Sequence, residues 1–108
     1  MSYKIETNTL HVGHETKKTE GTRAVPIYQS TSYEFKDSDH AAKLFSLAEP
    51  GYIYTRLNNP TNDILEQRLA SLEGGIGAVS TASGTSAITT TRIMLVKSGE
   101  HFVASNIP

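Results

Sequence analysis

The sequence contains no cysteine and no tryptophan, and aromatic residues make up only 7% of its 108 positions. The lack of cysteine excludes a disulfide framework and any metal site built from thiolates, and it permits a cytoplasmic origin. Apolar residues account for 37% of the chain, which is little for an independent hydrophobic core. We therefore expect a single domain, or a part of one that needs a partner in order to fold.

An excess of charge of one sign is also absent, since 10 basic and 11 acidic side chains give a formal net charge of −1. Such a balanced surface does not attract polyanions, so we expect no nucleic-acid partner. No window approaches the roughly 18 apolar residues of a membrane span, and the first residues lack the apolar core of a secretory signal. These absences predict a soluble, cytoplasmic protein that does not bind membranes.

The sequence pattern changes near residue 51. Residues 1–51 show little sustained periodicity and predict an extended N-terminal arm, with a short helix that begins near Asp37 and ends at Pro50-Gly51. The arm has too few apolar residues to be ordered by itself. Residues 52–108 predict the start of an α/β domain, with a helix from Asn59 or Thr61 to Gly74-Gly75, a strand at 76–82, a helix from Ser83-Gly84 to 97–99, and a strand at 102–104.

Two segments of this second part favour phosphate binding. Tyr54 and Arg56 lie one residue apart, so on an extended segment a phenol and a guanidinium project to the same side. The turn through Ser83 into a helix directs unpaired N–H groups at one point, and Gly84 leaves room for an anion to approach the backbone. On these residues alone, a solvated Tyr-x-Arg face and ordinary helix capping remain open alternatives.

Several runs then resemble one known family. GYIYTRLNNPT at 51–61, LEGG at 72–75 and VPIYQSTSY at 25–33 resemble the signature of the Cys/Met-metabolism family of pyridoxal-phosphate (PLP) enzymes. Within that family the chain is most similar to the O-acetylhomoserine/O-acetylserine sulfhydrylases, from about His11 to its end. The resemblance implies an α/β fold: an N-terminal arm plus the beginning of the large domain of a fold-type I PLP-dependent transferase.

The resemblance also implies roles for residues. Gly84 and Thr85 would give backbone N–H groups to the PLP phosphate; many family members have methionine in place of Thr85, which does not affect a backbone contact. Tyr54 and Arg56 would reach the phosphate bound by the neighbouring subunit, which implies a homodimer with composite sites and, by the same resemblance, a homotetramer. The lysine that anchors the cofactor would lie beyond Pro108. We therefore nominate no catalytic residue and expect the 108-residue chain alone to be inactive.

By resemblance, the intact enzyme would make homocysteine or a relative from O-acetylhomoserine and sulfide, with PLP as the cofactor and an amino acid as the small-molecule substrate. Cystathionine γ-synthase, cystathionine γ-lyase and methionine γ-lyase share these N-terminal motifs and remain alternatives. From a different class, the chain could be a truncated, non-catalytic interaction module that docks on a full-length partner through its arm.

Three other patterns suggest a function, but their sequence context does not support it. GIGAVS at 75–80 imitates a dinucleotide fingerprint, but a predicted helix precedes it where a strand is needed. His11 and His14 have the spacing of a metal-binding pair on a helix, but Gly13 lies between them and no third ligand is evident. Ser83 lacks the glycine-flanked context of a hydrolase nucleophile. We therefore predict no metal site.

Overall fold

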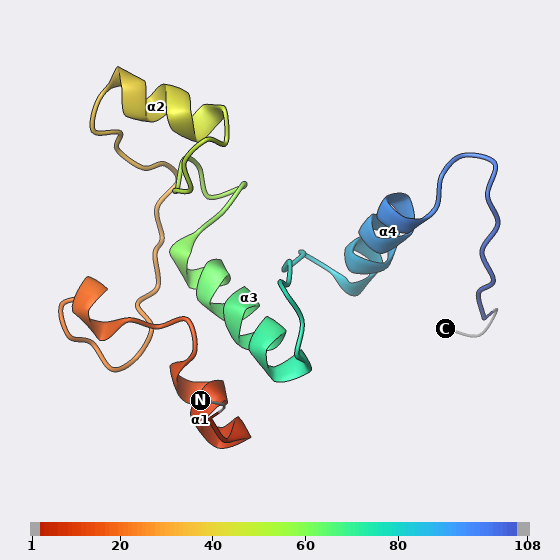
Figure 1. Cartoon of the computed structure of the whole chain (residues 1–108), viewed down its shortest axis with the longest axis horizontal. Coiled ribbons are helices and arrows are strands. Elements are labelled where there is room, and N and C mark those ends of the chain that lie inside the picture. The colour runs from red at the N-terminus through yellow and green to blue at the C-terminus, as the bar shows by residue number, and fades with distance from the viewer. Residues whose placement is uncertain (1–2, 106–108) are drawn as a thin grey trace. The chain divides into compact units, whose positions relative to one another are not determined.

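A computed structural model describes residues 3–105; residues 1–2 and 106–108, the outer ends of the predicted arm and domain, lie outside the described residues. The chain forms two compact units, Met1–Ala78 and Val79–Pro108, each of which is described by itself. The division into an arm at 1–51 and a domain at 52–108 stays a prediction. The helical segments of the described residues are α1 (Ile5–His11), the 3-10 helix η1 (Thr16–Lys18), α2 (Ser38–Phe45), α3 (Pro60–Glu73) and α4 (Gly84–Leu95) (Figure 1).

Helix α3 is the longest element, and local sequence signals explain both of its ends. The Asn59 side chain accepts a hydrogen bond from the Thr61 N–H, and Pro60 occupies the first helical turn, where a missing N–H costs nothing. Gly74 ends the helix in the left-handed conformation, with φ of 67°. The predicted helix from Asn59 or Thr61 to Gly74-Gly75 is confirmed, with Asn59 as its cap.

Residues 5–11 of the arm form helix α1, which the sequence analysis did not predict. With seven residues α1 is too short to be stable alone, and it packs beside α3 (Figure 1). From α3, the Arg68 guanidinium donates to the Leu10 carbonyl and the Val12 carbonyl, both at 2.9 Å. Gly13 then passes close to α3 with φ of +77°, where an added Cβ would lie 3.1 Å from the nearest α3 side-chain atom. Leu10 and Val12 are therefore held in place by contacts more than 50 residues away in sequence.

Helix α2 begins as predicted but ends early. The Asp37 carboxylate caps it by accepting from the His40 N–H at 2.7 Å. The helix ends at Phe45 and not at Pro50-Gly51. Leu44, which is 2% exposed, instead packs under Gly51, where a Cβ would come within 2.7 Å of the Leu44 side chain. Gly51 thus allows the chain that leads to Tyr54 to pass directly over α2.

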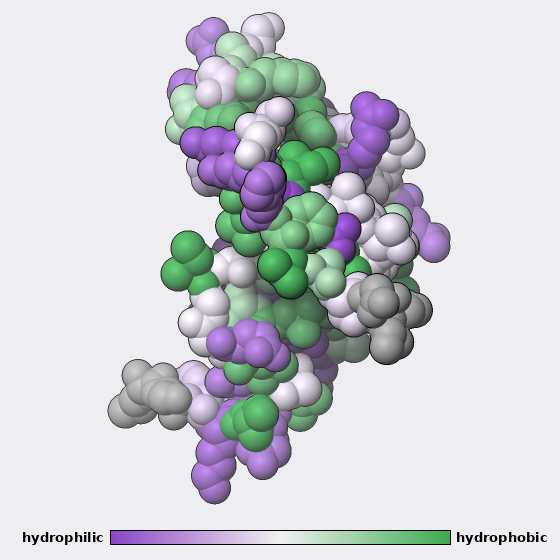
Figure 2. Space-filling model, turned by 90° about the vertical axis from the view of Figure 1, so that its right-hand side faces the viewer, coloured by the Kyte–Doolittle hydropathy of each residue, from purple (hydrophilic) through white to green (hydrophobic). Residues whose placement is uncertain are grey.

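In the second unit, α4 begins at Gly84 as predicted, because the Ser83 hydroxyl accepts from the Ser86 N–H at 3.1 Å. The two predicted strands, at 76–82 and 102–104, are wrong: residues 3–105 contain no strand. A strand needs a neighbouring strand to pair its backbone, and these segments have none. No residue of α4 is buried. The unit exposes several large apolar side chains, namely Val79, Ile88, Ile93, Met94, Leu95, Phe102 and Val103. Figure 2 shows that apolar side chains, in green, also reach the surface on the face that it draws.

Candidate functional site

Tyr54 and Arg56 lie together in one groove of the first unit. The groove has a volume of about 590 Å³ and is also lined by residues 27–31 and by side chains around the start of α3. Tyr54 pairs with Ser32 in an isolated antiparallel bridge, and the next three residues form a turn closed by a 2.9 Å hydrogen bond from the Leu57 N–H to the Tyr54 carbonyl. The expectation of an extended segment is therefore wrong at Arg56. The turn nevertheless brings the Arg56 guanidinium to 5.5 Å from the centre of the Tyr54 ring.

Both side chains are available to a ligand. Arg56 is exposed, and no carboxylate pairs with its guanidinium within the described part of the chain. Tyr54 is 39% exposed. A guanidinium with free N–H donors binds an oxyanion bidentately, and a phenol O–H adds a further donor. The groove therefore offers a guanidinium and a phenol O–H to an anion.

Asn59 joins the Tyr54–Arg56 turn to the arm, a role that the sequence analysis missed. It is 4% exposed, and its Nδ2 atom donates to the Tyr28 carbonyl at 2.9 Å, to the Tyr33 hydroxyl at 3.1 Å and to the Thr55 hydroxyl at 3.1 Å. The sequence indicated Asn59 only as a helix cap. The hydrogen bond from Asn59 to Tyr28 joins residues 31 positions apart, so no local sequence pattern predicts it. The place of Asn59 in the LNNPT run is the one signal that could have indicated a second role.

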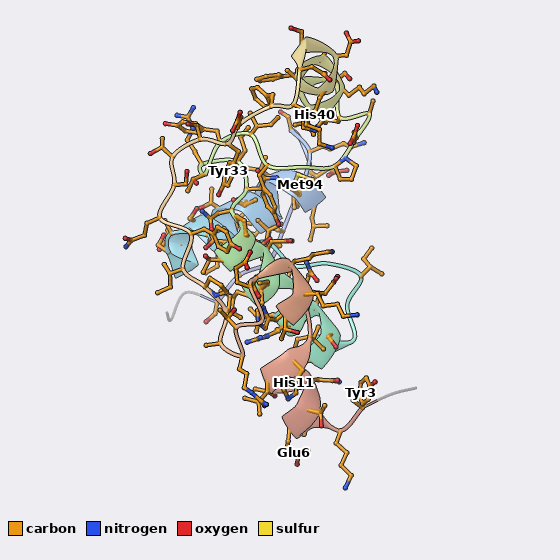
Figure 3. The ribbon with its side chains drawn as sticks, turned by 90° about the vertical axis from the view of Figure 1, so that its left-hand side faces the viewer. Tyr3, Glu6, His11, Tyr33, His40 and Met94 are labelled. Carbon is orange, nitrogen blue, oxygen red and sulfur yellow. The ribbon has the colours of Figure 1, made fainter. Side chains whose placement is uncertain are left out.

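Tyr52 and Asp63 form a second link between the same loop and α3. The Tyr52 hydroxyl donates to Asp63 Oδ2 at 2.9 Å, and the Tyr52 ring packs 5.4 Å from the ring of Tyr33, which Figure 3 labels. Burial and the hydrogen bond to Asp63 raise the pKa of Tyr52 from 10.0 to about 12. The folded protein therefore favours the neutral phenol, which can donate where a phenolate would repel the carboxylate.

Replacing Tyr52 by phenylalanine is expected to remove the tyrosine that ionises near pH 12 in the folded protein. The folded-state pKa is above the unfolded one, so the stabilisation is fully present below pH 10 and is lost as the pH rises through 12. An alkaline titration followed by tyrosinate absorbance checks this, with the exposed Tyr3→Phe as a control that should keep the late-ionising group. An unchanged high-pH transition in Tyr52→Phe would contradict the assignment.

The second unit contains the other two predicted site residues, at the N-terminus of α4. Gly84 and Thr85 occupy its first two helical positions, where N–H groups have no acceptor inside the helix. The space beside Gly84 is open, since no atom lies within 4 Å of where a Cβ would be. Gly84 and Thr85 therefore offer two adjacent backbone donors and the positive end of the helix to an anion. The structure brings Tyr54 and Arg56 together in one unit, and Gly84 and Thr85 together in the other.

The structure gives no support to a metal site at His11 and His14. His14 Nε2 lies 2.8 Å from the Thr22 carbonyl, a contact within the arm, while His11 ends α1. Among residues 3–105 no group of three or more metal-binding side chains comes together. No helix in this range is long and apolar enough to cross a membrane.

Comparison with known proteins gives consistent matches. Residues 6–107 match the family described as Cys/Met metabolism PLP-dependent enzyme. The chain is 55% identical over 105 residues to an O-acetyl-L-homoserine sulfhydrylase from Leptospira meyeri, and 49% identical over 105 residues to a homocysteine synthase from Schizosaccharomyces pombe. Each alignment covers 97% of this chain but 24% of the relative, so the chain spans about a quarter of the length of these relatives.

Solved structures show the same likeness. One, described as an O-acetylhomoserine (thiol)-lyase from Campylobacter jejuni, is 45% identical with a TM-score of 0.85, over 91% of this chain and 24% of that one. It contains N'-pyridoxyl-lysine-5'-monophosphate at its position 205. A second, metB from Corynebacterium glutamicum, is 32% identical with a TM-score of 0.79, over 93% of this chain and 24% of that one. These matches confirm the predicted fold class, the arm and the beginning of a PLP-dependent transferase domain.

Proposed function

This chain belongs to the Cys/Met metabolism PLP-dependent enzyme family, and on that premise we propose that it is the N-terminal part of a sulfhydrylase that makes homocysteine from O-acetylhomoserine and sulfide. The names of its relatives from Leptospira meyeri and Schizosaccharomyces pombe support this activity over the other reactions of the family. The observation that carries the proposal is the grouping of Tyr54 with Arg56, which has no carboxylate partner among residues 3–105, in one unit and of open backbone donors at Gly84 and Thr85 in the other.

The residues of this chain fit the phosphate end of the cofactor. Arg56 would hold the phosphate charge with its guanidinium, and Tyr54 would donate its phenol O–H. Gly84 and Thr85 would donate backbone N–H groups from the start of α4. When bound, PLP supplies an electron sink for reactions at the amino-acid substrate. Within this chain, the four residues bind and orient the cofactor and move no proton.

The proposed assembly is a homodimer with composite sites, in which Tyr54 and Arg56 of one subunit serve the phosphate held by Gly84 and Thr85 of the other. Support for this sharing comes from the family resemblance, which implies that Tyr54 and Arg56 reach the phosphate bound by the neighbouring subunit. We further propose that the dimers associate into a homotetramer and that the enzyme is cytoplasmic, in keeping with the absence of cysteine.

Product analysis on the proposed full-length enzyme tests the function. We expect homocysteine and acetate from O-acetylhomoserine and sulfide, at a higher kcat/KM than for any other tested substrate of the family. Preferred formation of cystathionine from cysteine would identify a cystathionine γ-synthase, and preferred release of a 2-oxo acid from cystathionine or methionine would identify a γ-lyase. The 108-residue polypeptide, assayed in parallel, should show no turnover; activity there would overturn the assignment of its residues to cofactor binding alone.

A further inference from the structure

The side chain of Asn59 has no N–H donor left for a ligand. Its Oδ1 atom accepts from the Thr61 N–H at 2.9 Å and caps α3. Its Nδ2 atom has two hydrogens for three acceptors, and two of these, the hydroxyls of Tyr33 and Thr55, lie 3.5 Å from each other and can share one hydrogen. The other hydrogen serves the Tyr28 carbonyl. An amide that is buried to this degree and uses both of its N–H hydrogens inside the protein acts on its neighbours and not on a bound molecule.

The neighbour that matters most is Thr55, which lies between Tyr54 and Arg56. Its backbone N–H donates to the Thr31 carbonyl at 2.9 Å, and its hydroxyl donates to the Ser30 carbonyl while accepting from Asn59. These bonds fix Thr55, the first residue of the turn, to the arm on one side and to the start of α3 on the other. The directions of the two flanking side chains therefore depend on where Asn59 holds Thr55.

We propose that Asn59 is the positioning residue for the phosphate clamp: through Thr55 it holds Tyr54 and Arg56 at the geometry that a phosphate requires. The inference rests on the proposed function. Asparagine is suited to the position because it combines the acceptor that caps α3 with a two-hydrogen donor, whereas aspartate and serine keep the cap and lack that donor. A clamp that binds charge bidentately is sensitive to displacements of about 1 Å.

Asn59→Ser and Asn59→Asp, made in the proposed full-length enzyme, separate the two roles of this residue. Both variants retain a good helix cap, so α3 and the fold should persist, as circular dichroism would show. The PLP dissociation constant, measured by equilibrium dialysis, is expected to rise about three- to tenfold, less than on removal of the guanidinium itself. Unchanged PLP affinity in both variants would overturn the proposal.

A double-mutant cycle shows whether Asn59 acts through the clamp. In an Arg56→Ala background, Asn59→Ser should weaken PLP binding by much less than it does in the wild type, because the charged group that Asn59 positions is gone and only the contact of Tyr54 remains. Full additivity of the two losses would overturn the proposal. If Arg56→Ala itself leaves PLP affinity unchanged, the proposed function fails as well, so the two failures are distinguishable.

Two further variants distinguish a specific effect of Asn59 on PLP binding from a general loss of structure. Arg68→Met removes the hydrogen bonds that hold α1 on α3 and should lower stability without changing PLP affinity. An equal loss of affinity in Arg68→Met would mean that any destabilisation of the arm has this effect, and would overturn the specific role of Asn59. If both Asn59 variants fail to fold, Thr55→Val removes the acceptor of the same bond and is judged by the same criteria.

Discussion

Replacing Arg56 by alanine in the proposed full-length enzyme is expected to raise the PLP dissociation constant about ten- to hundredfold. A hydrogen bond to a charged group contributes about 1.5–3 kcal/mol, and each 1.4 kcal/mol corresponds to about a factor of ten in affinity. The Arg56 guanidinium has no carboxylate partner among the described residues, so its N–H groups are available to the phosphate. We therefore expect the loss of affinity to correspond to the whole of this interaction. Equilibrium dialysis with PLP measures it.

Two matched variants sharpen the Arg56 test. Arg56→Lys should recover only part of the lost affinity, because a point charge cannot reproduce the two-pronged contact of a guanidinium. Arg23→Ala removes an exposed arginine of the arm that does not line the groove, and PLP affinity should stay at the wild-type value. Wild-type affinity in Arg56→Ala would contradict the role of this residue in phosphate binding.

Replacing Gly84 by alanine is expected to weaken PLP binding about tenfold or more while leaving the cofactor-free protein as stable as before. Gly84 is helical, and an added Cβ meets no atom within 4 Å, so the methyl group costs nothing in the fold itself. The change also lowers the conformational entropy of the unfolded chain, which stabilises the folded protein by about 0.4–1 kcal/mol. A phosphate seated against the Gly84 N–H would, however, be displaced by that methyl group, with the loss of charge-assisted hydrogen bonds of about 1.5–3 kcal/mol each.

The two effects of Gly84→Ala are measured separately, as the melting temperature of the protein after PLP removal and as the PLP dissociation constant. Gly77→Ala is the matched control, because its added Cβ also meets open space but Gly77 is not at the start of a helix. A Gly84→Ala variant that binds PLP as tightly as the wild type would show that this glycine serves the turn and not a ligand.

The elements that could be predicted from the sequence are those whose signals are local. The caps at Asp37, Asn59 and Ser83 and the left-handed glycine at Gly74 place helix ends, and all four act within a few residues of their own positions. The start of α2, both ends of α3 and the start of α4 were predicted for this reason. The pattern of residues 52–108 indicated an α/β domain, and the resemblance to a known family added that it is the beginning of a PLP-dependent transferase domain.

The features that were missed depend on distant residues. Helix α1 is short and gains its stability from Arg68, so no periodicity within the arm could reveal it. The alternation of side chains at Tyr54 and Arg56 predicts an extended segment. Hydrogen bonds from Thr55 to the carbonyls of Ser30 and Thr31 in the arm instead hold the chain in a turn. The strands at 76–82 and 102–104 were predicted from composition, but a strand exists only where a neighbour pairs with it.

The central claim is that the phosphate site is composite, with Tyr54 and Arg56 from one subunit and Gly84 and Thr85 from another. Hybrid oligomers test it most directly: subunits with Arg56→Ala and subunits with Gly84→Ala are co-expressed with different tags and purified through both. If the site is shared, some sites in the hybrid combine an intact Arg56 with an intact Gly84 and bind PLP with wild-type affinity, although neither parent does. If every site in the hybrid binds PLP as weakly as the parents, both pairs act within one subunit, and the composite site is contradicted.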